Sequence, residues 1–339
     1  MKLLKYLFLG LIFIATGSTY AQDTNEDKEE RKPGHYNENR FKQLYEEFST
    51  PNVYRTASGA PGPQYYQQQA DYKMDITLDD KNARLYGKET ITYTNNSPDI
   101  LEYLWIQLDQ NVRAADSKSP LIESSGAAPA DMAGRFVGQY MGAPFDGGFK
   151  IQEVKDGNGK DLPNLINQTM MRVEMPKDLK PGEKFSFSIK WWYNIPEHTI
   201  DRARSGYETF EDGNRGYVIA QFYPRMAVYN DVEGWQNSQF WGRDEFALPF
   251  GNFDVNITVP ADHTLDATGK LLNRKEVFSK TMMQRYAKAK KEYTTPVQIV
   301  TEEEAEVASK GFATATKTWK FRAENVRDYG IATSRRYMW

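Results

Sequence analysis

The sequence contains no cysteine among its 339 residues. This absence excludes disulfide bonds, thiol nucleophiles and thiolate-bound metals. Histidine is nearly as scarce, because only His35, His198 and His263 are present. No two of them lie within one helical turn, so the zinc-binding pattern His-Glu-x-x-His is absent. A Gly-x-Ser-x-Gly nucleophile elbow is absent as well. The sequence therefore predicts no catalytic and no metal-binding residue in this chain.

Basic clusters and long apolar runs are also scarce. The net charge is −3 with a pI near 5.8, so we expect no nucleic-acid partner. The one extended apolar run, residues 7–17, follows Lys2 and Lys5 and precedes Thr19 and Ala21. This pattern predicts a signal peptide over residues 1–21, with export to the periplasm or the extracellular space. The run is shorter than the roughly 20 residues that cross a bilayer. We expect no membrane span after signal removal.

Past the signal, residues 22–62 are mostly polar and then rich in Gly and Pro. We interpret them as a flexible leader with one short helix over Phe41–Phe48. A second stretch rich in Gly, Ala, Ser and Pro, Ala114–Gly148, predicts an extended surface loop. These two segments flank and interrupt the ordered part of the chain.

Alternating polar and apolar residues dominate from residue 64 onward and predict strands separated by turns. A clear example is the alternating run 185–193, which follows the turn residues Pro181 and Gly182. Residues 275–312 instead carry apolar residues at helical spacing, including Val277, Met282, Met283, Tyr286 and Ala287. We expect a mostly β fold, an antiparallel multi-stranded saddle or sandwich-like domain, with a helical insertion packed on its own sheet rather than on a partner.

Three segments in order, Met170–Pro196, Tyr217–Gly269 and Thr318–Trp339, resemble the amino-terminal β-domain of the aminopeptidase N-like zinc metallopeptidases. The last, TWKFRAENVRDYGIATSRRYMW, is similar to the family's crossing from this domain into the catalytic domain. The resemblance implies a β-domain over residues 63–328 and the beginning of a truncated catalytic domain over residues 329–339.

The resemblance also implies the function. The chain is expected to be the amino-terminal fragment of an exported zinc aminopeptidase, in which a missing catalytic domain binds zinc and hydrolyses peptides from the amino end. This chain alone would bind no cofactor and would be inactive. In the family, a T-Q-x-[EQ]-A segment receives the amino end of the substrate. Here Gln221 aligns with that segment and Tyr223 replaces its acidic or amide residue, so Gln221 and Tyr223 are the predicted substrate-binding residues. Alternatively, the two simply alternate along a strand.

Other interpretations have weaker support. A stand-alone secreted β-sandwich module could bind glycan or protein through aromatic rings, namely Trp191, Trp192, Tyr193, Trp235 and Trp241. The run Asp156–Gly159 is reminiscent of a calcium loop, but Leu162 and Pro163 follow where further oxygen ligands are needed. His198 lies between Glu197 and Asp201, in a sequence more typical of a hydrated loop than of a metal site.

Overall fold

The computed structural model describes residues 51–122, 145–198, 205–242 and 247–339, all within the unit Gly34–Trp339. The predicted signal peptide, the predicted helix at Phe41–Phe48 and the centre of the predicted loop Ala114–Gly148 lie outside these residues. No helix in the described part is long and apolar enough to cross a membrane. These ranges contain all the strands and helices discussed below.

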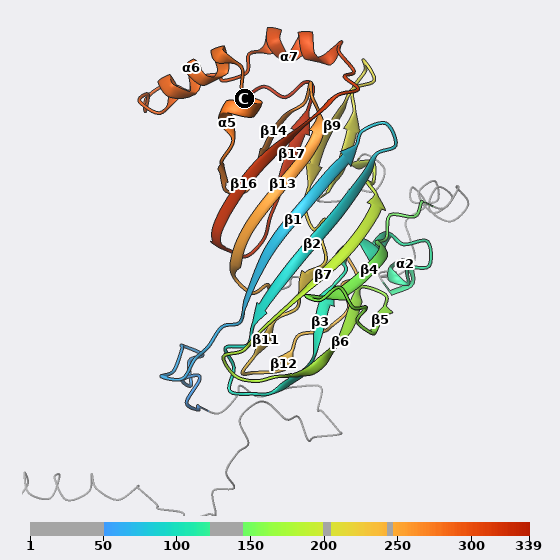
Figure 1. The fold of residues 1–339 in the computed structure, drawn as a ribbon, viewed down its shortest axis with the longest axis vertical. Helices are drawn as coiled ribbons and strands as arrows, with labels where there is room; N and C mark the ends of the chain where they lie inside the picture. The colour runs from blue at the N-terminus through green and yellow to red at the C-terminus, as the bar shows by residue number, and fades with distance from the viewer. Residues whose placement is uncertain (1–50, 123–144, 199–204, 243–246) are drawn as a thin grey trace, which may run out of the picture. The chain divides into compact units, whose positions relative to one another are not determined.

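A seven-stranded sheet is the largest element, and its order is β15-β16-β13-β1-β2-β7-β4 (Figure 1). Neighbouring strands are antiparallel except β1 and β13, which are parallel. The bounds are β1 (Gln69–Asp79), β2 (Arg84–Thr94), β4 (Lys150–Asp156), β7 (Lys184–Asn194), β13 (Gly251–Pro260), β15 (Lys270–Leu271) and β16 (Thr316–Val326). The prediction of a mostly β, mostly antiparallel fold is confirmed.

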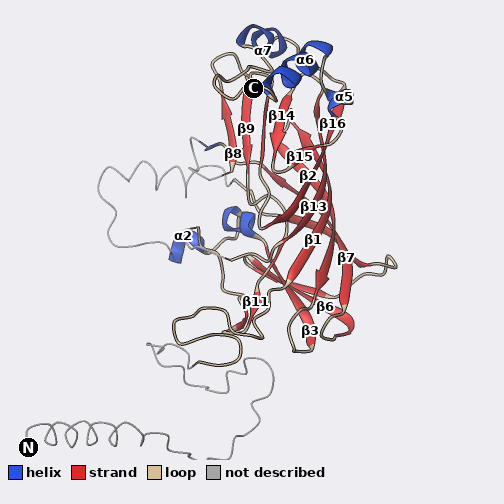
Figure 2. Cartoon of the chain, turned by 90° about the vertical axis from the view of Figure 1, so that its left-hand side faces the viewer, coloured by secondary structure: helices blue, strands red, loops and turns tan. Residues whose placement is uncertain are grey.

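Two four-stranded sheets pair the remaining longer strands (Figure 2). The first, called the β3 sheet, consists of β10 (Arg225–Met226), β3 (Leu101–Gln107), β6 (Met170–Leu179) and β5 (Asn164–Asn167). The second, called the β9 sheet, consists of β14 (Thr264–Ala267), β17 (Ile331–Ser334), β9 (Arg215–Ile219) and β8 (Gly206–Thr209). A short ribbon pairs β11 (Tyr229–Asn230) with β12 (Gly234–Trp235).

The helices are short. They are η1 (Asp109–Arg113), α2 (Ser119–Ile122), α5 (Arg274–Val277), α6 (Lys280–Ala289) and α7 (Glu302–Ser309). Helices α5 to α7 gather at one end of the seven-stranded sheet, with β3 and β6 at the other end (Figure 1). Met282, Met283 and Tyr286 of α6 are partly buried against the core, and the ring of Tyr286 packs on Phe278. These side chains therefore pack on the chain's own core.

The core lies on one face of the seven-stranded sheet, which we call the inner face. Along β1, Tyr72, Met74 and Ile76 are buried while the residues between them are exposed on the outer face or partly so. This alternation follows from the two-residue repeat of a strand. The other strands of the sheet continue it, so one face of the sheet is apolar and the opposite face is polar.

Two predicted boundaries can be compared with these elements. Residues 329–339, predicted as the beginning of another domain, contribute β17 to the interior of the β9 sheet. Arg55, within the predicted leader, forms an ion pair of 2.7 Å with the buried Asp231. The domain division itself stays a prediction.

Candidate functional site

The segment Ala220–Met226 follows β9 and ends with β10, so it runs from the β9 sheet to the β3 sheet. We call it the crossover segment. Its rings Phe222 and Tyr223 are fully buried. The ring of Tyr223 lies 5.3 Å from that of Tyr72, which is on the inner face of the seven-stranded sheet. The backbone amide of Met226 donates to the Tyr72 hydroxyl at 3.0 Å. The crossover segment is therefore anchored on the inner face.

Gln221 is held in an unusual backbone conformation within this segment. Its φ is 53°, in the left-handed region that residues with a Cβ rarely adopt. The buried side chain of Gln110, on η1, donates from Nε2 to the carbonyl of Gln221 at 2.8 Å and to that of Ala220 at 3.4 Å. Gln221 is 6% exposed, yet within the described residues its side-chain amide makes no hydrogen bond. The amide therefore has unused hydrogen-bonding capacity.

Tyr223 contributes a hydroxyl to an ionic cluster. It donates to Oδ1 of Asp328 at 3.1 Å. Burial, followed by the charge of Asp328, raises the pKa of Tyr223 well above its ordinary value, so the phenol stays protonated and acts as a donor. Gln221 and Tyr223 both lie in irregular backbone, so the alternative in which they alternate along a strand does not describe them.

Arg225 is the centre of this cluster, which we call the Arg225 cluster and which also contains Asp109, Tyr223 and Asp328. The guanidinium contacts Oδ2 of Asp109 at 2.7 Å and Oδ2 of Asp328 at 2.9 Å. The side chains of Arg225 and Asp109 are 1% exposed, whereas that of Asp328 is 41% exposed. Burial raises the pKa of Asp109 even though Arg225 opposes the shift. Asp328 is therefore the open carboxylate of the cluster.

Strand pairing brings Gln221 and Asp328 to the same end of the β9 sheet. Ile219 at the end of β9 pairs with Ile331 at the beginning of β17. Because the two strands are antiparallel, the residues after Ile219 and those before Ile331 leave the sheet side by side. An unpartnered amide and an open carboxylate thus lie on adjoining segments. Both offer oxygen acceptors, a combination suited to a ligand with N–H donors and a positive charge.

The sequence prediction named Gln221 and Tyr223 and missed the residues that hold them. Gln110, Asp109 and Arg225 are fully buried polar residues, and Asp328 belongs to the Asn-Val-Arg-Asp run of the last matching segment. A charged residue within an otherwise apolar aromatic segment, as Arg225 is, was the available signal. The substrate-binding role of Gln221 and Tyr223 stays a prediction.

The histidines do not form a metal centre in the described part of the chain. His263 is fully buried, and its Nδ1 lies 3.2 Å from the hydroxyl of Thr333. Burial, followed by the positive charge of Arg335, lowers the pKa of His263 to about 4. Across residues 51–122, 145–198, 205–242 and 247–339, no three His, Cys, Asp or Glu side chains are grouped to hold a metal ion. The described residues therefore do not fit a zinc site.

The run Asp156–Gly159 forms a closed turn. Oδ1 of Asp156 accepts the backbone amides of Asn158 and Lys160, each at 2.9 Å. These hydrogen bonds lower the pKa of Asp156, with the Lys160 amide as the largest cause. In this structure the Asp156 carboxylate stabilises the turn through these hydrogen bonds.

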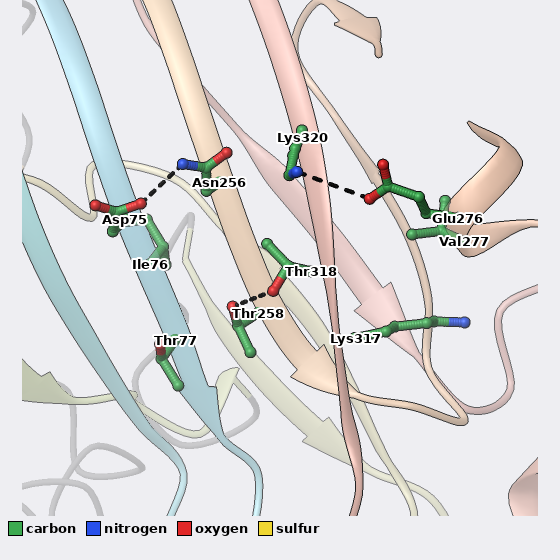
Figure 3. A pocket seen from close by; sticks show the side chains of 10 residues that line it. All are labelled: Asp75, Ile76, Thr77, Asn256, Thr258, Glu276, Val277, Lys317, Thr318 and Lys320. Carbon is green, nitrogen blue, oxygen red and sulfur yellow. Dashed lines mark hydrogen bonds and ion pairs between the residues drawn. The ribbon is translucent and has the colours of Figure 1, made fainter. Parts of the chain in front are cut away.

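A hollow of about 420 Å³ lies on the outer face beside α5 (Figure 3). Six of its polar side chains face one another in pairs, and Thr77 and Lys317 also line it. Asn256 donates to Asp75 at 2.8 Å, the hydroxyls of Thr258 and Thr318 are 2.8 Å apart, and Lys320 lies 3.7 Å from Glu276. Because most of the polar groups pair with one another, the hollow gives no specific indication of a ligand.

The aromatic side chains of the alternative binding module do not share one surface. Trp191 and Tyr193 are buried in the core, whereas Trp192, between them, points to the outer face. Trp235 is partly buried and packs against Tyr93 and Tyr229. The geometry therefore gives no specific support to a platform made of these rings.

Comparisons with known proteins find similarity among solved structures alone. No protein-family model matches the chain, and no curated protein matches it. An M1 zinc metallopeptidase from Deinococcus radiodurans, in a mutant form bound to a Tyr-Ser-Ala substrate, is 13% identical, with a TM-score of 0.40 over 79% of this chain and 42% of that chain. The M1 zinc metallopeptidase from Deinococcus radiodurans without that substrate gives the same identity and TM-score over 81% and 43%. The chain thus spans less than half the length of these structures. Similarity this low is a partial match and decides no function.

Proposed function

We propose that this chain is the amino-terminal portion of an exported zinc-dependent aminopeptidase, in which it supplies scaffold and the wall that receives the amino end of a peptide. The order of the three matching sequence segments supports this assignment. The crossover segment adds a local observation, because Gln221 and the neighbouring Asp328 offer oxygen acceptors. Catalysis would belong to the remainder of the protein.

The observation that carries the proposal is the conformation of Gln221. A left-handed backbone at a residue with a Cβ costs on the order of 1 kcal/mol and persists where its surroundings fix it. Here the Gln110 side chain supplies that restraint through the carbonyl of Gln221. The result is a largely buried amide without a partner among the described residues. Strained backbone that presents an unused polar group is typical of a binding site.

The chemistry divides between the two parts of the proposed enzyme. Zinc, when bound by the remainder of the protein, would activate water for peptide hydrolysis. Gln221 would orient the substrate by accepting from its amino group, and the buried rings beside it would exclude water. Such positioning contributes because interactions with the amino end fix the scissile bond relative to the hydrolytic centre.

The nucleotide sequence that follows codon 339 provides the first test. We expect the reading frame to continue into a segment that contains His-Glu-x-x-His and, further on, a third zinc ligand. A stop codon directly after Trp339 in the native gene would contradict the proposal. Binding of a polysaccharide by the purified chain, together with that stop codon, would favour the stand-alone binding module.

Substitution of Gln221 in the full-length protein provides the second test. We expect Gln221→Ala to raise KM for an aminoacyl reporter roughly tenfold with a smaller change in kcat, because one hydrogen bond to a charged group is lost. Gln168→Ala is the matched control, since Gln168 also has a left-handed φ, of 52°, but lies in the turn between β5 and β6. Equal effects of the two variants would contradict the role of Gln221.

A further inference from the structure

We propose that Asp328 supplies the negative charge that binds the substrate's protonated amino group, with the amide oxygen of Gln221 beside it. This inference rests on the proposed function. It names the residue that gives the proposed enzyme its preference for substrates with a free amino group. Asp328 lies on the segment between β16 and β17, apart from the crossover segment that carries Gln221.

Within the Arg225 cluster two carboxyl groups, those of Asp109 and Asp328, contact the single guanidinium of Arg225. Asp109 and Arg225 are buried, so their positions are fixed by packing and their partners cannot be exchanged for solvent ions. Asp328 is the exposed member, so a cation can reach its carboxylate from outside the cluster. The chemical class of ligand that fits is a primary ammonium.

The hydrogen-bonding capacity of the Asp328 carboxylate supports the same assignment. An ionised carboxylate offers about four acceptor sites. Asp328 uses three of them, for the hydroxyl of Tyr223 at 3.1 Å, the amide of Tyr329 at 2.8 Å and Nη1 of Arg225 at 2.9 Å. One site remains for an N–H donor, and Asp328 is the cluster's exposed member. The unpartnered amide of Gln221 is a second, independent acceptor group at the same end of the sheet.

The substitution at position 223 is consistent with this assignment. Resemblance to the family predicts an acidic or amide side chain there, but the chain has Tyr223. Its phenol donates to Asp328 instead of accepting from a ligand. Asp328, from a neighbouring segment, thus provides the carboxylate that position 223 lacks, and the Tyr223 hydroxyl holds Asp328 in place. Tyr223 is a positioning residue in this arrangement.

The test compares two competitive inhibitors of the full-length enzyme, alaninamide and propionamide, which differ by the amino group. We expect the wild type to prefer alaninamide roughly ten- to a hundredfold, the size of a hydrogen bond between charged groups. Asp328→Asn should abolish most of this preference, and Tyr223→Phe should reduce it in part. Asn at 328 keeps one carbonyl oxygen that accepts from Arg225, and its NH2 group donates to the Tyr223 hydroxyl while the bond from the Tyr329 amide is lost. Asp109 still pairs with Arg225, so we expect the variant to fold.

Asp254→Asn is the matched control. Asp254 has the same side-chain exposure as Asp328, 41%, and likewise pairs with an arginine, Arg322, but lies on the outer face. The Asp254→Asn variant should leave the preference for alaninamide unchanged. An active Asp328→Asn enzyme that retains the full preference would overturn the inference and leave the proposed function intact. A full-length protein without aminopeptidase activity would overturn both.

Discussion

At the scale of single residues, Glu89 is the clearest departure from ordinary packing. It lies on the inner face of β2, between Met74 of β1 and Ile189 of β7 in the strand register. The side chain is fully buried, and neither carboxyl oxygen has a hydrogen-bond partner within the described residues. Burial raises the pKa of Glu89 well above its ordinary value of 4.5. The acid is therefore neutral in the folded chain at pH values where it ionises when unfolded.

This shift predicts a loss of stability as pH rises. Above the unfolded pKa near 4.5, the unfolded chain releases the Glu89 proton while the folded chain keeps it. From there up to the raised folded pKa, the free energy of unfolding should fall by about 1.4 kcal/mol per pH unit from this group. Urea unfolding from pH 5 upward measures the slope. Glu89→Gln, which cannot ionise, should remove this contribution, and an unchanged slope in that variant would contradict the prediction.

A second prediction at this scale concerns the Arg225 cluster. Arg225→Met removes the buried guanidinium and leaves Asp109 without its counterion, so we expect a loss of about 3–5 kcal/mol in unfolding free energy. The exposed pair of Arg322 and Asp254 supplies the control, because Arg322→Met should cost less than about 1 kcal/mol. Denaturant unfolding of both variants measures the difference. Equal losses of unfolding free energy in the two variants would contradict the prediction that burial makes the Arg225 cluster more sensitive.

At the scale of elements, the packing of β2 against β7 depends on a residue without a side chain. The indole of Trp191 lies over Gly87, and a Cβ added to Gly87 would lie 2.1 Å from a ring carbon. These residues are register partners on adjacent strands. The large ring of one strand therefore occupies the space that a side chain of the other would need.

Gly87→Ala should accordingly destabilise the chain by about 1–3 kcal/mol, because the buried ring must move. Gly157 is the control, since a Cβ there would meet its nearest atom at 3.8 Å in the turn after β4. Thermal unfolding of the two variants checks the prediction. A Gly87→Ala protein as stable as Gly157→Ala would contradict this view of the core.

The same scale shows what could be predicted from sequence. Strands such as β7 were predictable, because the alternation of Phe187, Ile189 and Trp191 with polar neighbours is local. The parallel pairing of β1 with β13 was not, since it joins distant parts of the chain. Likewise Gln221 could be found from its own segment, whereas Arg225 meets Asp109 and Asp328 across 116 and 103 positions. Local sequence patterns do not predict such long-range contacts.

At the scale of the whole molecule, the proposal concerns a binding wall formed where the sheets adjoin. Three sheets meet around the crossover segment, which presents Gln221 and lies beside Asp328. The described residues bring no group of metal ligands together. Under the proposal, this chain would contribute recognition of the substrate and the remainder of the enzyme would contribute hydrolysis.

The most direct measurement compares aminoacyl reporter hydrolysis and zinc content for two purified proteins, this chain and the product of the complete native reading frame. The account predicts stoichiometric zinc and turnover for the complete product, and neither for this chain. Tightly bound zinc with turnover by this chain, or a complete product that lacks both, would contradict it.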